Sequence, residues 1–142
     1  MTEGTISKGV HRLPLRVYYE DTDFSGNVYH ANYLKFCERA RSDFLRVAGI
    51  DQNAMFGAGD PIMFVVRRML CDFLRPARFD DLLVIETRLG ELAGARFELK
   101  QQVLRGDESL FSADVTVALI DGRGRPRRVP PEIAARIVSA TS

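Results

Sequence analysis

The chain has 142 residues, the common size of a single domain, so a second independent core is not expected. Its 20 basic and 19 acidic residues give a formal net charge of +1, so no overall field attracts nucleic acid or anionic lipid. No window reaches the roughly 18 apolar residues of a membrane span, and the first residues lack the apolar core of a signal peptide. These features predict a cytoplasmic globular protein with no nucleic-acid partner and no membrane span.

The cysteines and histidines are few and scattered. Cys37 and Cys71 do not form a CxxC pair, and His11 and His30 lie far apart in the sequence. Zinc sites need closely spaced ligands of these types, so no metal site is expected. A structural disulfide is also not expected in a cytosolic chain that can build its own core.

The N-terminal third begins with a polar segment. Residues 1–12 are mixed in character and predict a flexible N-terminal arm, whereas residues 13–142 are expected to form one domain. Residues 13–20, LPLRVYYE, predict a strand that runs into the turn-rich string DTDFSGN. Alternation along that strand would place Tyr18 and Tyr19 on opposite faces.

Residues 29–50 change to a helical period. Apolar side chains recur at helical spacing, namely Tyr33, Cys37, Ala40, Phe44 and Val47. Gly49 fits the C-terminal end of such a helix. The segment therefore predicts one long helix, followed by a loop at residues 53–61.

The remainder predicts antiparallel strands. Four stretches have strand character, residues 62–75, 81–89, 95–105 and 109–120, separated by short breaks that contain Gly, Pro or Asp. Pro130 and Pro131 precede a short predicted C-terminal helix. This order indicates an α+β fold with the long helix packed on one sheet. No GxGxxG or GxxxxGK[ST] string is present, which argues against a glycine-rich phosphate loop.

The junction between the first strand and the long helix carries the strongest chemical signal. Glu20, Asp21 and Asp23 precede a helix whose first-turn N–H groups can polarise a carbonyl. A carboxylate facing such N–H groups suits thioester cleavage, because a thiolate leaves without strong acid assistance. No GxSxG string occurs, so a serine nucleophile is not indicated. The alternative is that Asp21 and Asp23 are ordinary turn or capping residues.

The strings VYYEDTD, VYHANY and ERAR, with Gly26 between them, resemble the signature of the 4-hydroxybenzoyl-CoA thioesterase family. The resemblance is closest to its Tol-Pal-associated acyl-CoA thioesterase branch (YbgC type), and it continues through FVVRRM and PARFDD. It implies a hotdog fold, in which an antiparallel sheet wraps one long helix, and a dimer whose two sheets join edge to edge. One sheet around a single helix also leaves a long edge strand exposed in a monomer, so a homodimer or homotetramer is expected. The resemblance also implies an acyl-CoA substrate, with acyl carrier protein as an alternative carrier. No cofactor is expected, since CoA is part of the substrate.

The resemblance also implies the site residues. Asp23 corresponds to the catalytic aspartate, as nucleophile or general base, and Tyr19 and His30 correspond to its companions. The backbone N–H near His30 would polarise the thioester carbonyl. Phe24 and Ser25 stand where relatives often carry a small residue and glycine, which leaves the acyl preference open.

Several of these residues also have plain structural interpretations. Tyr19 and His30 could serve packing and hydrogen bonding, and Glu38 could either face the site or pair with neighbours on the helix surface. Candidate ligands for CoA phosphates are Arg67, Arg68, Arg123, Arg125, Arg127 and Arg128. Of these, Arg67, Arg68 and Arg125 are our preferred candidates, and the alternative is that they are solvated surface arginines.

Two rival functions remain open at the level of sequence. One is a hotdog hydratase or dehydratase that acts on acyl-CoA through proton abstraction. The other is a non-enzymatic acyl-CoA sensor or an interaction partner of lipid-synthesis enzymes. The DTD string before the helix favours thioester hydrolysis over both.

Overall fold

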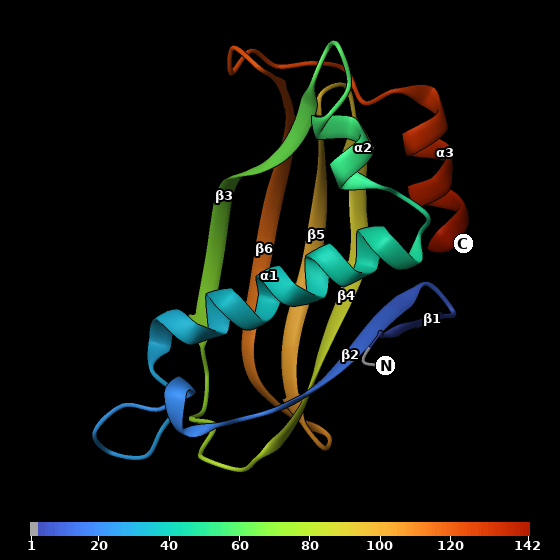
Figure 1. Ribbon diagram of the computed structural model, residues 1–142. Coiled ribbons are helices and arrows are strands. Elements are labelled where there is room, and N and C mark those ends of the chain that lie inside the picture. The colour runs from blue at the N-terminus through green and yellow to red at the C-terminus, as the bar shows by residue number, and fades with distance from the viewer. Residues whose placement is uncertain (1–2) are drawn as a thin grey trace.

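The computed structural model describes residues 3–142, which form an antiparallel six-stranded sheet with the strand order β1-β2-β4-β5-β6-β3. The strands are β1 (Thr5–Ser7), β2 (Val10–Arg16), β3 (Ile62–Phe73), β4 (Leu82–Ala93), β5 (Arg96–Arg105) and β6 (Glu108–Asp121). The helices are α1 (His30–Val47), α2 (Gln52–Phe56) and α3 (Pro131–Ala140), and η1 (Tyr19–Asp21) is a 3-10 turn. Figure 1 shows α1 lying across one face of the curved sheet.

Helix α1 forms where the sequence changes period, and its apolar stripe faces the sheet. The fully buried side chains Phe36, Cys37, Ala40 and Phe44 follow this stripe. Burial of each large apolar side chain contributes about 1.5–3 kcal/mol, which fixes the helix to the sheet. The helix ends at Val47, and Gly49 then adopts a φ of 88° as the predicted stop.

The inner face of the sheet supplies the other half of the core. Buried residues alternate along the central strands, as shown by Leu83 and Ile85 of β4, Phe97, Leu99 and Val103 of β5, and Phe111, Ala113, Val115 and Val117 of β6. One sheet therefore wraps one long helix, and the expected α+β hotdog architecture is confirmed. None of the helices within residues 3–142 is long and apolar enough to cross a bilayer.

The N-terminal segment differs from the expected flexible arm. Strands β1 and β2 pair as a hairpin from Thr5↔Arg12 to Ser7↔Val10, with positive φ at both turn residues, Lys8 and Gly9. The expectation is therefore wrong for residues 5–12, while residues 1–2 lie outside the described chain. Strand β1 forms an exposed edge of the sheet, so it carries polar residues and lacks the apolar alternation that predicts a strand.

The region of Tyr18 and Tyr19 is a second difference. Strand β2 ends at Arg16, and the Asp21 carboxylate accepts a hydrogen bond of 2.8 Å from the Tyr18 amide, which turns the backbone into η1. Both tyrosine side chains are exposed, so the expected alternation between core and solvent is wrong. Helix α2 was also missed, and it lies within a segment expected to be a loop, where the Asp51 side chain accepts from the Ala54 amide.

Candidate active site

The loop between η1 and α1 folds back on itself. Thr22 and Val28 form an antiparallel bridge, and the Asp23 amide donates to the Asn27 carbonyl at 2.8 Å. The tight turn needs Gly26, whose φ of 85° favours glycine. The loop therefore returns Asp23 to a position beside the residues that enter α1.

The Asp23 carboxylate is fully exposed at this turn. Its Oδ1 accepts hydrogen bonds from the Ser25 amide at 2.8 Å and from the Ser25 hydroxyl at 2.6 Å. These bonds, led by the hydroxyl, hold the Asp23 pKa below its usual value. Asp23 is therefore ionised at neutral pH, and Oδ2 makes no hydrogen bond within residues 3–142.

The first turn of α1 presents free amides next to this loop. The helix begins after Tyr29, whose side chain makes no capping bond. Within the described chain, neither the His30 amide nor the Ala31 amide donates a hydrogen bond. The buried Asn32 side chain donates to the Asp21 carbonyl at 2.8 Å and so ties the loop to the helix. The helix end can therefore accept a carbonyl oxygen or an oxyanion.

The two companion side chains have aromatic neighbours. The exposed His30 ring lies 4.5 Å from the Tyr29 ring and 6.1 Å from the Phe73 ring, measured between centroids. The Tyr19 ring stacks on Phe79 at 4.4 Å with an interplanar angle of 4°. His30 thus stands at the helix start, whereas Tyr19 packs against the β3–β4 connection.

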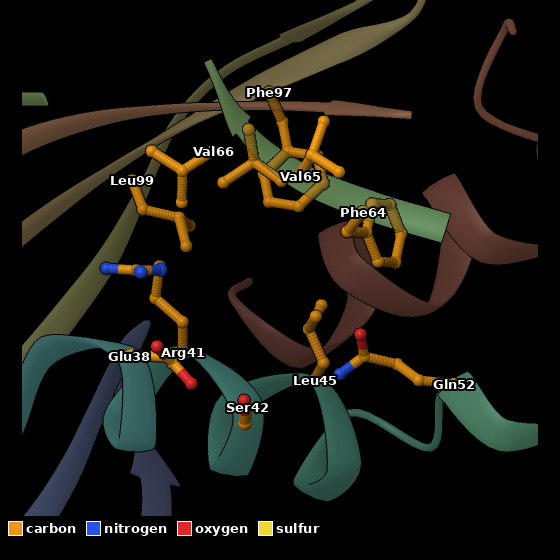
Figure 2. Close-up of a pocket in the computed structure, with 11 residues that line it drawn as sticks. Glu38, Arg41, Ser42, Leu45, Gln52, Phe64, Val65, Val66, Phe97 and Leu99 are labelled. Carbon is orange, nitrogen blue, oxygen red and sulfur yellow. The ribbon is translucent and has the colours of Figure 1, made fainter. Parts of the chain in front are cut away.

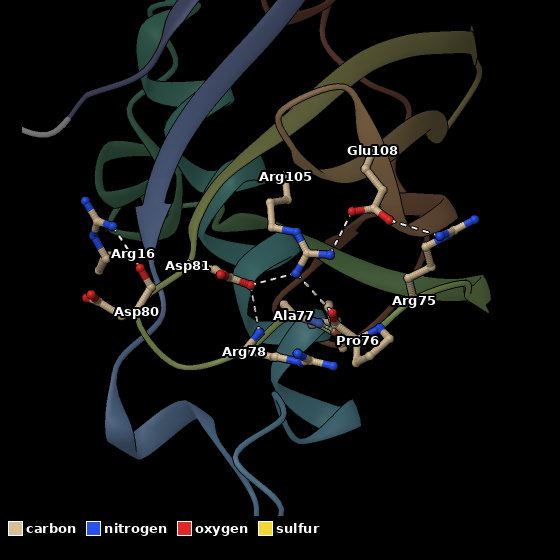
Figure 3. Close-up of polar contacts among 10 residues, drawn as sticks. Arg16, Arg75, Pro76, Ala77, Arg78, Asp80, Asp81, Arg105 and Glu108 are labelled. Carbon is tan, nitrogen blue, oxygen red and sulfur yellow. Dashed lines mark hydrogen bonds and ion pairs between the residues drawn. The ribbon is translucent and has the colours of Figure 1, made fainter.

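The β3–β4 connection, residues 74–81, is hydrogen-bonded to the loop that carries Asp23. The Val28 amide donates to the Ala77 carbonyl at 2.8 Å, and the Ala77 amide donates to the Tyr33 hydroxyl at 2.9 Å. Figure 3 shows Arg105 bridging Asp81 and Glu108 beneath the same segment, at 2.8 Å and 2.7 Å. A network of buried and half-buried contacts therefore fixes the Asp23 loop to the sheet.

The candidate CoA ligands do not gather in one place within the chain. Arg67 and Arg68 lie at a bulge in β3, and Arg68 lines the outer face of the sheet with Lys100 and Asp114. Arg125 lies in the turn after β6, next to Asp121, which pairs with Ile62. This turn is at the opposite end of β3 from the start of α1 (Figure 1).

Neither cysteine has the features of a nucleophile. Burial raises the pKa of Cys37 to about 12, so this side chain stays a thiol at neutral pH. Burial also raises the pKa of Cys71. The Asp23 carboxylate, in contrast, is exposed and ionised at neutral pH.

Three polar residues of the site were not identified from the sequence. Ser25 sets the state of the Asp23 carboxylate, Asn32 ties the loop to α1, and Tyr33 holds the supporting segment. The signal for Asn32 was present, because it is a polar residue on the buried face of a helix. Ser25 gave no such signal, since its bonds depend on the turn geometry.

Comparison with known families gives a match over residues 25–112 to the family described as the thioesterase superfamily. The chain belongs to the thioesterase superfamily. The matched region includes His30, all of α1 and strands β3 to β5. Asp23 lies two residues before it.

Individual thioesterases of this superfamily are similar over most of their length. The chain is 42% identical over 124 residues to "Acyl-CoA thioesterase YbgC" of Haemophilus influenzae, covering 87% of this chain and 90% of the relative. It is 40% identical over 126 residues to "Acyl-CoA thioester hydrolase YbgC" of Escherichia coli O6:H1, covering 87% and 92%. The crystal structure of a probable thioesterase from Bartonella henselae superposes with a TM-score of 0.82 at 49% identity, covering 85% and 99%.

Proposed function

We propose that this thioesterase-superfamily protein hydrolyses acyl-CoA thioesters, with Asp23 as the catalytic carboxylate. The observation that carries the proposal is the ionised, exposed Asp23 carboxylate on a loop that folds back beside the free first-turn amides of α1. The names of the relatives from Haemophilus and Escherichia agree with this substrate class. Acyl carrier protein is the alternative carrier of the same thioester.

The proposed reaction uses the two parts of the site, the first-turn amides of α1 and the Asp23 carboxylate. The amides of His30 and Ala31 hold the thioester oxygen and stabilise the negative charge that develops on it. Asp23 either attacks the carbonyl carbon, giving a mixed anhydride that water then hydrolyses, or takes a proton from the attacking water. In both routes the carbon–sulfur bond breaks, the CoA thiolate leaves and accepts a proton, and the free acid remains. His30 and Tyr19 are proposed to orient the substrate at the edge of this site.

Steady-state assays separate this function from its rivals. The purified protein is incubated with saturated acyl-CoAs, an enoyl-CoA and a thiol-reactive dye. Release of free CoA is the expected result. Hydration of the enoyl-CoA without CoA release would instead indicate a hydratase, and tight binding without turnover would indicate a sensor.

We also propose that the active form is at least a dimer, joined through β3. Among residues 3–142 this strand has only β6 as a neighbour, and its 12 residues include the exposed apolar side chains Val65, Val66, Leu70 and Phe73. A long apolar edge of this kind favours pairing with a second copy. A two-fold axis through β3 would join the two sheets edge to edge.

Such a dimer would explain how Arg125 could bind CoA at the active site of the partner subunit. Within one chain, β3 places the turn that holds Arg125 roughly 35 Å from the end of β3 that contacts His30. Antiparallel pairing would place the Ile62 end of one β3 opposite the Phe73 end of the other. Arg125 of the partner subunit would then approach the helix start and could bind a CoA phosphate.

The cytoplasm is the compartment that we propose for this activity. Cys37 and Cys71 are both free thiols, as is common in a reducing compartment. Acyl-CoA and acyl carrier protein would both be encountered there as substrates.

A further inference from the structure

A cavity of about 320 Å³ lies between α1 and the sheet, beyond the residues that form the proposed active site. Its sheet side is apolar and includes Phe64, Val66 and Leu99, while Arg41 and Leu45 of α1 form the opposite wall. This volume is at the lower end of the range for small-molecule pockets. The cavity therefore offers unfilled apolar space of a size that part of an acyl chain could occupy.

Arg41 stands at one end of this cavity. Figure 2 shows its guanidinium between the helix and Leu99, at the end that faces the N-terminus of α1, whereas Gln52 and Phe64 mark the other end. The Arg41 guanidinium and the Cys37 carbonyl both bond to the Gln101 side chain, at 3.0 Å each, which places the guanidinium close to the level of Cys37. The charge of Arg41 also acts to lower the pKa of Cys71 on strand β3, in agreement with this placement.

That level lies between the cavity and the free amide of His30. Along α1, Cys37 follows His30 by seven residues, which is about 10 Å. Along β3, Cys71 precedes Phe73 by two residues, which is about 7 Å, and the Phe73 ring contacts His30. An acyl chain that enters from His30 between α1 and β3 would therefore reach Arg41 before the cavity.

A half-buried hydrogen bond to the buried Gln101 side chain holds Arg41 in this position. Its Nη1 donates to Oε1 of Gln101 at 3.0 Å, and Gln101 donates to the Cys37 carbonyl and to the Thr87 hydroxyl, each at 3.0 Å. Gln101 and Thr87 are fully buried or nearly so. Displacing Arg41 would leave the Gln101 oxygen without its donor, and an alkyl chain beside the guanidinium would strip it of water.

We propose that Arg41 limits the length of the acyl chain that the protein hydrolyses, by closing the path from the thioester site to the cavity. The inference rests on the proposed thioesterase function, since it assumes that the thioester lies at His30. The distance of about 10 Å along α1 from His30 to the level of Cys37 corresponds to the length of an extended octanoyl chain, so longer alkyl groups must displace Arg41. Arg41 is thus a residue that determines specificity and takes no part in the bond-breaking step.

The test compares the chain-length profiles of the wild type and Arg41→Met. kcat/KM is measured with butanoyl-, hexanoyl-, octanoyl-, dodecanoyl- and tetradecanoyl-CoA, below the concentrations at which the longer thioesters form micelles. The wild type is expected to lose activity beyond octanoyl. Arg41→Met should raise the ratio of dodecanoyl to octanoyl activity by at least about tenfold, the effect of burying two of the four methylenes by which dodecanoyl exceeds octanoyl.

Two variants control for charge and for space. Arg39→Met removes the same charge from the exposed surface of α1, away from the cavity, and should leave the profile unchanged. Adding Leu99→Phe, on a strand away from the β3 edge, to Arg41→Met should fill the cavity and restore the wild-type limit. Melting curves recorded on the same samples show that each variant is folded.

The outcomes separate the inference from the function on which it rests. A wild type that hydrolyses dodecanoyl-CoA as well as octanoyl-CoA would overturn the inference, as would an unchanged profile in folded Arg41→Met. If the wild type releases CoA from no thioester of the panel, the proposed function itself is contradicted.

Discussion

At the scale of single residues, the proposed mechanism depends on one carboxylate and its immediate partner. Ser25 occupies one oxygen of Asp23 through two hydrogen bonds, and the other oxygen is left open. The same bonds are those of an ordinary turn, so geometry alone supports both interpretations of Asp23. What distinguishes the catalytic interpretation is the neighbouring helix end with its free amides.

The state of Asp23 leads to a prediction about Ser25. Ser25→Ala removes the hydroxyl bond, which is the largest cause of the lowered pKa, so the Asp23 pKa should rise toward its usual value. NMR titration of the Asp23 carboxyl carbon measures this in both proteins. The wild-type carboxylate should stay ionised to lower pH than the variant, and equal titration midpoints would contradict the assignment of the bond.

The sequence singles out Asp23 and His30 as candidates because they lie in a recognisable string at a strand–helix junction. It did not indicate that Tyr19 would stack on Phe79, because that contact joins segments 60 residues apart in sequence. For the same reason the sequence indicates Arg41 only as part of the string ERAR and as a surface partner of Glu38. Its role depends on Gln101, which lies on a distant strand.

At the scale of elements, long and strongly patterned segments were predictable and short ones were not. The apolar period of α1 and the strands β3 to β6 were clear, and the structure confirms them. Strand β1 and helix α2 were missed, since three and five residues carry too little pattern to outweigh their polar composition. The 3-10 turn at Tyr19 was missed because the Asp21 side chain, rather than periodicity, creates it.

The N-terminal hairpin provides a prediction at this scale. The Gly4 amide donates to Asp43 Oδ2 at 2.8 Å, and the same carboxylate oxygen lies 2.6 Å from His11 Nε2. A Cβ on Gly4 would come within 2.8 Å of both the Asp43 oxygen and the His11 nitrogen. Gly4→Ala should therefore lower the free energy of unfolding by about 1–3 kcal/mol.

The matched control is Gly59→Ala, because a Cβ at Gly59 meets no atom within 4 Å. Urea denaturation of the two variants and the wild type measures the difference. Equal stabilities for Gly4→Ala and Gly59→Ala would show that the hairpin does not depend on this close approach.

At the scale of the whole molecule, the two edges of the sheet are unlike. Strand β1 is short and polar, whereas β3 is long and carries exposed apolar side chains. The sequence predicted an oligomer because one antiparallel sheet around a single helix leaves a long edge strand exposed in a monomer. It did not indicate which strand forms that edge, because the identity of the edge strand depends on the order in which strands pair. The strand order shows that β3 is the long edge strand, and this makes Arg125 a candidate CoA ligand in the active site of a partner subunit.

The dimer leads to a prediction for Leu70, which is 56% exposed on β3. Leu70→Asp would place two like charges in the joined edges, so the dissociation constant should rise at least tenfold, by about 1.4 kcal/mol or more. Val138→Asp, at a position 49% exposed on α3, is the control and should not change it. Sedimentation velocity over a range of concentrations measures both. A wild type that remains monomeric at micromolar concentration and fully active would contradict the shared site.

The most direct test of the catalytic account is the initial rate of CoA release by Asp23→Asn. Amide and carboxylate are nearly the same size, so the fold and the affinity for CoA should be retained, with Ser25→Ala as the control that keeps the carboxylate. The account predicts a loss in kcat of at least about a hundredfold for Asp23→Asn. A variant that is destabilised by about 1 kcal/mol but still releases CoA at nearly the wild-type rate would contradict it, and would assign Asp23 to the turn alone.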